Sequence, residues 1–276
     1  MRGFPASFLL LFYQVALGGL FAIAAAPFHE LERGFYKSTA GVLFVAGVLG
    51  FLGNADIYLQ SPPKGARFGA AVEILFYFVF LCFFALYLYS LWGERALFRA
   101  RTFSLSLFTG LTGLALSSHA FYQAPFWSLE ALLYPLSFFL SALLLGGVTV
   151  GMLIGHWYLI DTGQSIDPFI RIYRFFFLSL LMQILSFLIF PLLLYMLGNP
   201  KTILRLQQLW EEHHVLLWAR LLIGQIAPLI ISAMIWRTLK IPHTIAATGL
   251  FYIALLGVFV GEILGRQILA LTSLPF

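Results

Sequence analysis

The chain has 276 residues, of which 61% are hydrophobic and only 10% are charged, and its net charge is +5. Soluble domains carry about 25% charged residues, so this composition excludes a soluble globular protein and is typical of a multi-pass membrane protein. The single cysteine, Cys82, excludes an intrachain disulfide, a c-type haem attachment and an iron–sulfur cluster held by the chain's own thiolates. The sequence has no basic run that would indicate nucleic-acid binding.

Apolar stretches of about 20 residues recur along the sequence, and each is long enough to cross roughly 30 Å of hydrocarbon as a helix. Eight are expected, at 7–28, 38–58, 69–92, 102–122, 131–160, 172–198, 214–236 and 243–271. Short connections with turn residues, such as DTGQSIDP, GNPK and KIPH, separate them. The predicted fold is an all-α membrane protein with eight transmembrane helices in a single integral membrane domain, 1–276.

Eight spans place both termini on the same side of the membrane. The loops on the opposite side carry more basic residues, so the positive-inside rule makes that side cytoplasmic and places both termini outside. The basic residues expected on the cytoplasmic side are Arg33, Lys37, Arg95, Arg99, Arg101, Arg171, Arg174, Arg237 and Lys240. Those expected on the side of the termini are Arg2, Lys64, Arg67, Lys201 and Arg205. We expect the protein in a bacterial inner (cytoplasmic) membrane.

The first and fifth spans share a short pattern. Each contains a Gly-Gly pair, at 18–19 and 146–147, followed by a histidine, an acidic loop and aromatic and basic residues that open the next span. This pattern is compatible with a duplication into halves 1–125 and 126–276, each forming a four-helix bundle in the same orientation.

Ionisable residues within a membrane are costly unless they are paired or face a cavity. In the half nearer the termini the polar residues are Asn54, Asp56, Glu73, His119, His213, His214, Arg220, Glu262 and Arg266. Glu262 lies roughly 13 Å from the end of its span, and Arg220 lies at similar depth in the preceding antiparallel span. Two interpretations remain open: a structural ion pair of Glu262 with Arg220 or Arg266, or a polar cavity that opens to the outer side.

The histidines near the span ends allow a further set of hypotheses. His156, in the motif GHWYLID, either anchors the helix at the interface or hydrogen-bonds a headgroup, a quinone or a partner subunit. A haem b would need a pair such as His119 with His213 or His214, or His29 with His156, but none of these lies in the middle of a span. The histidine spacing is not typical of a zinc or copper site, so no metal site is expected.

The eight spans, the outward termini, the lack of a cysteine framework and the motif GEILGR in the last span resemble the NrfD/DmsC-type membrane anchors of multisubunit oxidoreductases. The resemblance implies a subunit that binds menaquinol or ubiquinol towards the outer face and exchanges electrons with an iron–sulfur or cytochrome partner. It also departs from that pattern, because QILAL follows Arg266 where aromatic residues are expected, and GHWYLID has no counterpart.

The quinone hypothesis assigns roles to the polar residues. The proton acceptors would be Glu262, Glu73 and His119. The quinone or polar pocket would be lined by Arg220, Arg266, Asn54, Asp56 and His156. The alternatives are a small-solute transporter with gates at Pro191 and Pro228, a haem b electron carrier, and a scaffold subunit without chemistry.

Overall fold

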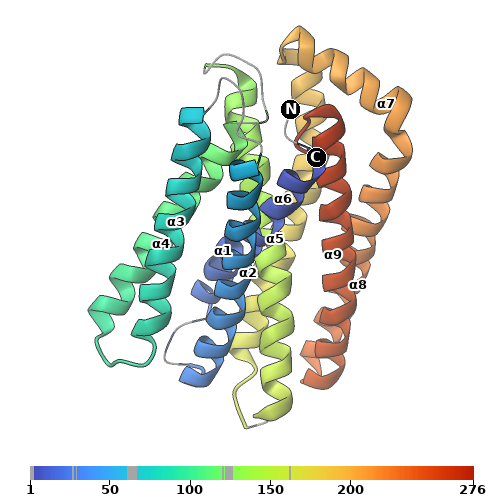
Figure 1. Cartoon of the computed structure of the whole chain (residues 1–276). Coiled ribbons are helices and arrows are strands. Elements are labelled where there is room, and N and C mark those ends of the chain that lie inside the picture. Colours follow the sequence, from blue (N-terminus) through green and yellow to red (C-terminus); the bar gives the residue numbers. More distant parts are fainter. Residues whose placement is uncertain are drawn as a thin grey trace.

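The computed structural model of the chain describes residues 3–26, 28, 30–60, 67–119, 121, 127–161 and 163–276. Long helices, joined by short turns and loops, make up these ranges (Figure 1). In chain order they are α1 (Phe4–Ala24), α2 (Arg33–Gln60), α3 (Arg67–Ser90), α4 (Ala96–His119), α5 (Leu129–Ile160), α6 (Asp167–Leu197), α7 (Pro200–Leu221), the π-helical turn η1 (Leu222–Ile226), α8 (Ala227–Lys240) and α9 (Thr244–Thr272).

Seven helical segments in the described ranges are long and apolar enough to cross a membrane. They are α1, α2, α3, α5, α6, the continuous segment Pro200–Lys240 and α9. The remaining expected span corresponds to α4, which packs antiparallel to α3 but is less apolar because two arginines and a series of serines and threonines lie along it (Figure 1). The protein is therefore an all-helical, multi-pass membrane protein in its described part.

Helix α1 lies at the centre of the molecule and packs most extensively against α5. At their crossing, a Cβ added to Gly18 would overlap the carbonyl of Ala142, and one added to Gly146 would overlap the backbone of Gly18. Small residues allow membrane helices to approach this closely. One glycine of each Gly-Gly pair that suggested a duplication thus lies in this contact, whereas Gly19 faces α2 and Gly147 faces α6.

From the sequence, a short connection is expected before a span that begins at residue 214, but the structure has a helix, α7, that begins at Pro200. It crosses the end of the bundle and turns along the bundle at His213, whose φ of −129° is not helical (Figure 1). Residues 200–212 form an amphipathic helix in which Leu206 and Leu209 pack on the end of the bundle while Glu211 faces outward. A sliding average of hydropathy does not detect such a helix, because its polar face cancels its apolar face.

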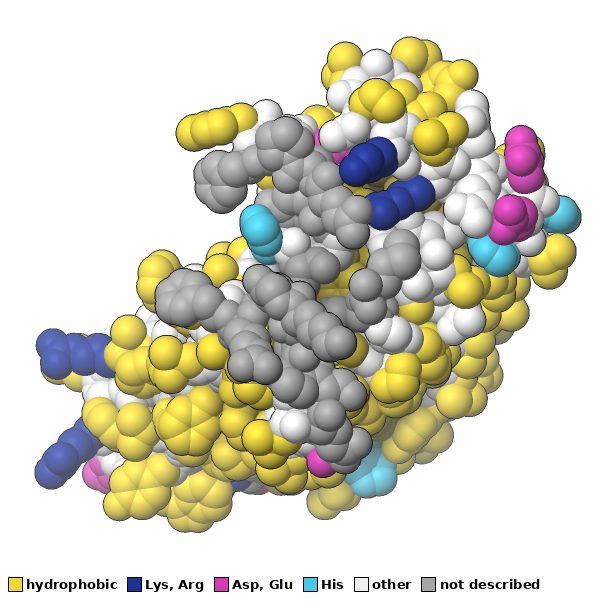
Figure 2. All heavy atoms as spheres, turned by 45° about the horizontal axis from the view of Figure 1, so that its top comes forward, with side chains coloured by type: hydrophobic (Ala, Val, Ile, Leu, Met, Phe, Trp, Pro, Cys, Tyr) yellow, Lys and Arg dark blue, Asp and Glu magenta, His cyan; other side chains and the backbone are white. Residues whose placement is uncertain are grey.

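Both ends of the chain lie at the end of the bundle that α7 crosses (Figure 1). Viewed towards this end, apolar side chains cover the flanks, and acidic and histidine side chains gather at one edge (Figure 2). The sequence of α7 accounts for that edge, because it places two glutamates and two histidines in succession at 211–214. The charged groups at the surface are thus concentrated at helix ends, as expected for helices surrounded by lipid.

Candidate functional site

A buried cluster of charged and amide side chains lies between α1, α5, α7 and α9. Glu262 accepts a hydrogen bond from Arg220 Nη2 at 2.9 Å on its Oε1, and one from Arg266 Nη2 at 3.3 Å on its Oε2. The side chains of all three residues are at most 5% exposed. Both cationic partners considered from the sequence therefore contact Glu262, one on each carboxylate oxygen. We call Arg220, Glu262, Arg266 and Gln14 the arginine–glutamate cluster.

Further hydrogen bonds attach this cluster to the helices around it. Arg220 donates through Nη1 to the carbonyl of Gly261. Arg266 Nη2 also donates to Gln14 Oε1 at 2.9 Å, and Gln14 Nε2 donates to the carbonyl of Phe138 at 2.8 Å. The guanidinium carbon of Arg266 lies 5.1 Å from the centre of the Phe138 ring, within the range of a cation–π contact. The cluster thus connects α9 to α7, α1 and α5.

Glycines in GEILGR and in the π turn make room for these charges. A Cβ on Gly224, in η1, or on Gly261, in α9, would overlap the backbone of the other residue. A Cβ on Gly265 would lie 2.7 Å from Cζ of Arg220. A π turn inserts an extra residue into a helix and is often found at functional sites. Here it begins two residues after Arg220 and joins α7 to α8.

The cluster contains two guanidinium groups and one carboxylate, and so carries an excess positive charge when all three are ionised. Among the described residues, the Nε atoms of Arg220 and Arg266 have no hydrogen-bond partner, and neither does the side-chain amide of the buried Gln225. Unpartnered donors and unbalanced charge are costly in an apolar interior. The two arginine Nε groups therefore keep unused hydrogen-bond donors within the cluster.

Residues 273–276 fold back from the end of α9 towards this cluster. The backbone turns at Ser273, whose φ is +57°. The hydroxyl of Tyr134 donates to the carbonyl of Ser273 at 2.6 Å, and the hydroxyl of Ser137 donates to the carbonyl of Pro275 at 2.6 Å. Two side chains of α5 thus hold this segment inside the helical bundle.

The side chains of Leu274 and Phe276 occupy an apolar space that is distinct from the main core. It is lined by Leu133, Leu140, Phe190, Leu194, Leu209 and Ile268, from α5, α6, α7 and α9. The carbonyl of Phe276 and the guanidinium of Arg220 both lie against Gly265, because a Cβ there would be 2.5 Å from the former and 2.7 Å from the Cζ of the latter. We call this region, which the side chains of Leu274 and Phe276 fill, the tail chamber; it borders the arginine–glutamate cluster.

A second polar group lies on the other side of α1. Glu73 accepts a hydrogen bond from Ser117 at 2.8 Å, beside a cavity of about 10 Å³ that Tyr13 and Asn54 also line. A cavity of this size holds about one water molecule. Tyr13 faces Glu73, whereas the next residue, Gln14, belongs to the arginine–glutamate cluster. Helix α1 therefore separates the two polar groups.

The remaining candidate residues lie elsewhere. Asn54 donates to the carbonyl of Gly50 on its own helix, and Asp56 and His119 are exposed. His156 is exposed at the opposite end of α5, with its Nδ1 3.3 Å from the hydroxyl of Tyr252. The structure thus brings together Arg220, Glu262 and Arg266, but not the full candidate set. Of the histidines considered for haem, His29 lies outside the described residues.

Sequence reasoning missed Gln14 and the tail chamber. A fully buried glutamine in the middle of an apolar span is a signal of the same kind as Glu262, because its amide also needs partners in lipid. The sequence carries no comparable signal for the segment 273–276, since its residues are ordinary for a helix end. Within the described ranges, no group of three or more His, Cys, Asp or Glu side chains is arranged to hold a metal ion.

Comparison with known proteins assigns no family to this chain. No protein-family model matches the sequence, and no curated protein shows significant similarity to it. The function therefore has to be argued from the site.

Proposed function

We propose that this protein is a quinone- or quinol-interacting membrane subunit of an electron-transfer complex, which passes electrons to or from a partner redox subunit. The observation that carries the proposal is the buried arginine–glutamate cluster bordering an apolar chamber. A quinone has the same two-part character, because its carbonyls accept hydrogen bonds while its ring and isoprenoid tail are apolar.

In this proposal the quinone ring takes the space that Leu274 and Phe276 fill in the tail chamber. Arg220 lies at the border of that chamber and donates to a quinone carbonyl, since its Nε has no other partner in the described chain. Charged donors form stronger hydrogen bonds than neutral ones, which favours arginine over a hydroxyl at this position. Menaquinone and ubiquinone both present the required carbonyls.

Oxidation of a quinol releases two electrons and two protons. The electrons go to the redox centre of an iron–sulfur or cytochrome partner, and the protons need a carboxylate or imidazole that communicates with water. Glu262 is the proposed first acceptor. Glu73 and His119 are proposed as further proton acceptors nearer the surface, but helix α1 separates Glu73 from Glu262, so no direct transfer between the two carboxylates is proposed. Asn54, Asp56 and His156 have no direct contact with the quinone in this scheme.

Substitution of Glu262 tests the proposal. Glu262→Gln is expected to lower quinol-dependent electron transfer by about 100-fold or more, because the amide cannot take up a proton. The rate is measured in membranes that contain the native partner subunits and is normalised to the amount of monodisperse protein extracted. The control is Glu212→Gln, an exposed glutamate of α7. A wild-type rate in Glu262→Gln contradicts the proposal.

A second candidate function is transport of a small solute. It is favoured by the π turn at Leu222–Ile226 and the glycine contact between Gly224 and Gly261, which together resemble a hinge in a membrane helix. Solute uptake by proteoliposomes that contain the purified protein and no quinone would select this alternative.

A further inference from the structure

A wedge-shaped space separates α4 from α1 at the end of the bundle opposite the chain termini. Helix α4 packs closely along α3 but contacts α1 only slightly. The lower ends of α3 and α4 diverge from the rest of the bundle (Figure 1). The resulting pocket has a volume of about 340 Å³, which lies within the range of sites that bind small amphiphilic ligands.

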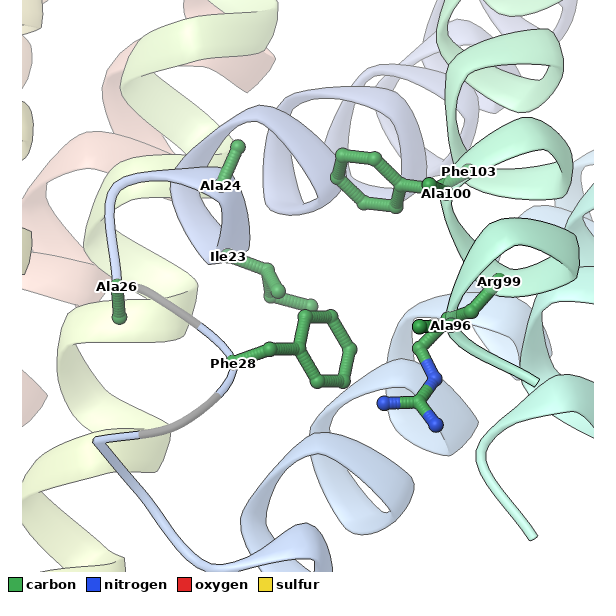
Figure 3. Close-up of a pocket in the computed structure, with 8 residues that line it drawn as sticks. All are labelled: Ile23, Ala24, Ala26, Phe28, Ala96, Arg99, Ala100 and Phe103. Carbon is green, nitrogen blue, oxygen red and sulfur yellow. The ribbon is translucent and has the colours of Figure 1, made fainter. Parts of the chain in front are cut away.

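The lining of the wedge is apolar except for one arginine. Ile23 and Phe28 face it from the α1 side, and Phe103 faces it from α4 (Figure 3). Several lining alanines are exposed, among them Ala24 and Ala100, so the pocket opens to the surroundings of the helices rather than into the core. In a membrane protein this opening faces acyl chains.

Arg99 lies at the rim of the wedge with unused hydrogen-bonding capacity. Its guanidinium group lies beside the Phe28 ring (Figure 3), with the guanidinium carbon 5.1 Å from the ring centre. Its Nη2 donates to the carbonyl of Gly93 at 2.9 Å. Its Nε is buried without a partner, and no carboxylate in the described part of the chain forms an ion pair with it. The planar guanidinium fork matches the geometry of a phosphate group.

The surroundings of Arg99 add positive charge and place it near the membrane surface. Arg95 precedes Arg99 by four residues, and the first turn of α4 contains no acidic residue, although Glu94 lies beside Arg95 just before the helix. Nearby, Lys37 Nζ lies 5.0 Å from the centre of the Trp92 ring, and exposed tryptophans are typical of the membrane interface. A molecule held here therefore meets cations at the interface and apolar side chains below them.

We propose that the wedge between α1 and α4 is the binding site of one anionic phospholipid. One acyl chain lies between Ile23, Phe28 and Phe103, and the phosphate accepts hydrogen bonds from Arg99. This occupant follows from charge complementarity together with the opening of the pocket towards lipid. The proposal does not depend on the quinone hypothesis, because the wedge and the arginine–glutamate cluster share no residue, although α1 contributes to both.

The test measures which lipid stays bound to the full-length protein. Protein in nanodiscs of equal phosphatidylglycerol and phosphatidylcholine is released into the gas phase, and the retained lipids are identified by native mass spectrometry. Three variants are compared with the wild type: Arg99→Gln removes the phosphate partner, Ala100→Phe fills the wedge, and Arg101→Gln removes an exposed arginine of the same helix as a matched control.

The wild type and Arg101→Gln are expected to retain one phosphatidylglycerol in preference to phosphatidylcholine. Arg99→Gln is expected to lower that preference about fivefold, and Ala100→Phe to abolish retention of either lipid. The proposal is overturned if the wild type shows no preference, if Arg99→Gln behaves as the wild type, or if Ala100→Phe still retains the lipid. Displacement of the lipid by excess inorganic phosphate would also overturn it, because the site would then select a free anion.

Discussion

At the scale of single residues, the motif GEILGR combines two functions on one helix. Gly261 and Gly265 lie where α9 meets the π turn and the guanidinium of Arg220, and they leave the space that these groups need. Glu262 and Arg266 are the charged members of the cluster. Close packing and a buried charge cluster thus depend on the same six residues.

The glycine contact predicts a difference between two substitutions in α9. Gly261→Ala is expected to destabilise the protein by about 1–3 kcal/mol, because its Cβ would overlap Gly224 and force α9 away from the π turn. Gly249→Ala, whose Cβ would meet no atom within 4 Å, is expected to stabilise it by about 0.5–1 kcal/mol through helix propensity. Unfolding in detergent measures both. Equal effects of the two substitutions would show that the contact is not tight.

The depth of a residue in the membrane was predictable from the sequence, whereas the neighbouring helix that its side chain faces was not. Counting along the spans placed Arg220 and Glu262 at the same level, and the structure pairs them at 2.9 Å. The same counting placed Glu73 in the same half of the membrane, but that residue faces the other side of α1. The rotation of each helix about its axis depends on contacts such as those of Gly18 and Gly146, which a single sequence does not specify.

At the scale of helices, long apolar runs predicted the elements well because a membrane-spanning segment must satisfy its backbone hydrogen bonds internally. The expected spans at 131–160 and 243–271 correspond to α5 (Leu129–Ile160) and α9 (Thr244–Thr272) within two residues at each end. The first part of α7 was missed because its mean hydropathy is low, although its apolar residues occur with helical periodicity.

The segment 273–276 acts in this account as a displaceable occupant of the tail chamber. Removing both of its hydrogen bonds to α5, with Tyr134→Phe and Ser137→Ala together, is expected to raise quinone affinity about tenfold, because less free energy opposes its displacement. Titration with a short-chain quinone, followed by tryptophan fluorescence, measures the change. Ser179→Ala, which removes a hydrogen bond within α6, serves as the control. An unchanged quinone affinity in the folded double variant would show that residues 273–276 do not occupy the quinone site.

At the scale of the whole molecule, the distribution of basic residues predicts the orientation in the membrane. In a background with Cys82→Ser, Gln207→Cys on α7 and Ser165→Cys in the loop before α6 place reporters at opposite ends of the bundle. An impermeant maleimide is expected to label Gln207→Cys in intact spheroplasts, and Ser165→Cys only after permeabilisation, because the end richer in arginine faces the cytoplasm. The reverse labelling pattern would invert the orientation and place the cluster nearer the cytoplasm.

The central claim is that a quinone binds where the arginine–glutamate cluster borders the tail chamber. Photo-crosslinking of the purified protein in nanodiscs with an azido-quinone, followed by peptide mapping, tests it most directly. The account predicts saturable labelling of one quinone per chain, confined to peptides of α7, α9 and the segment 273–276, and suppressed by unlabelled quinone. Labelling that does not saturate, or that maps to helices away from Arg220 and Gly265, would contradict it.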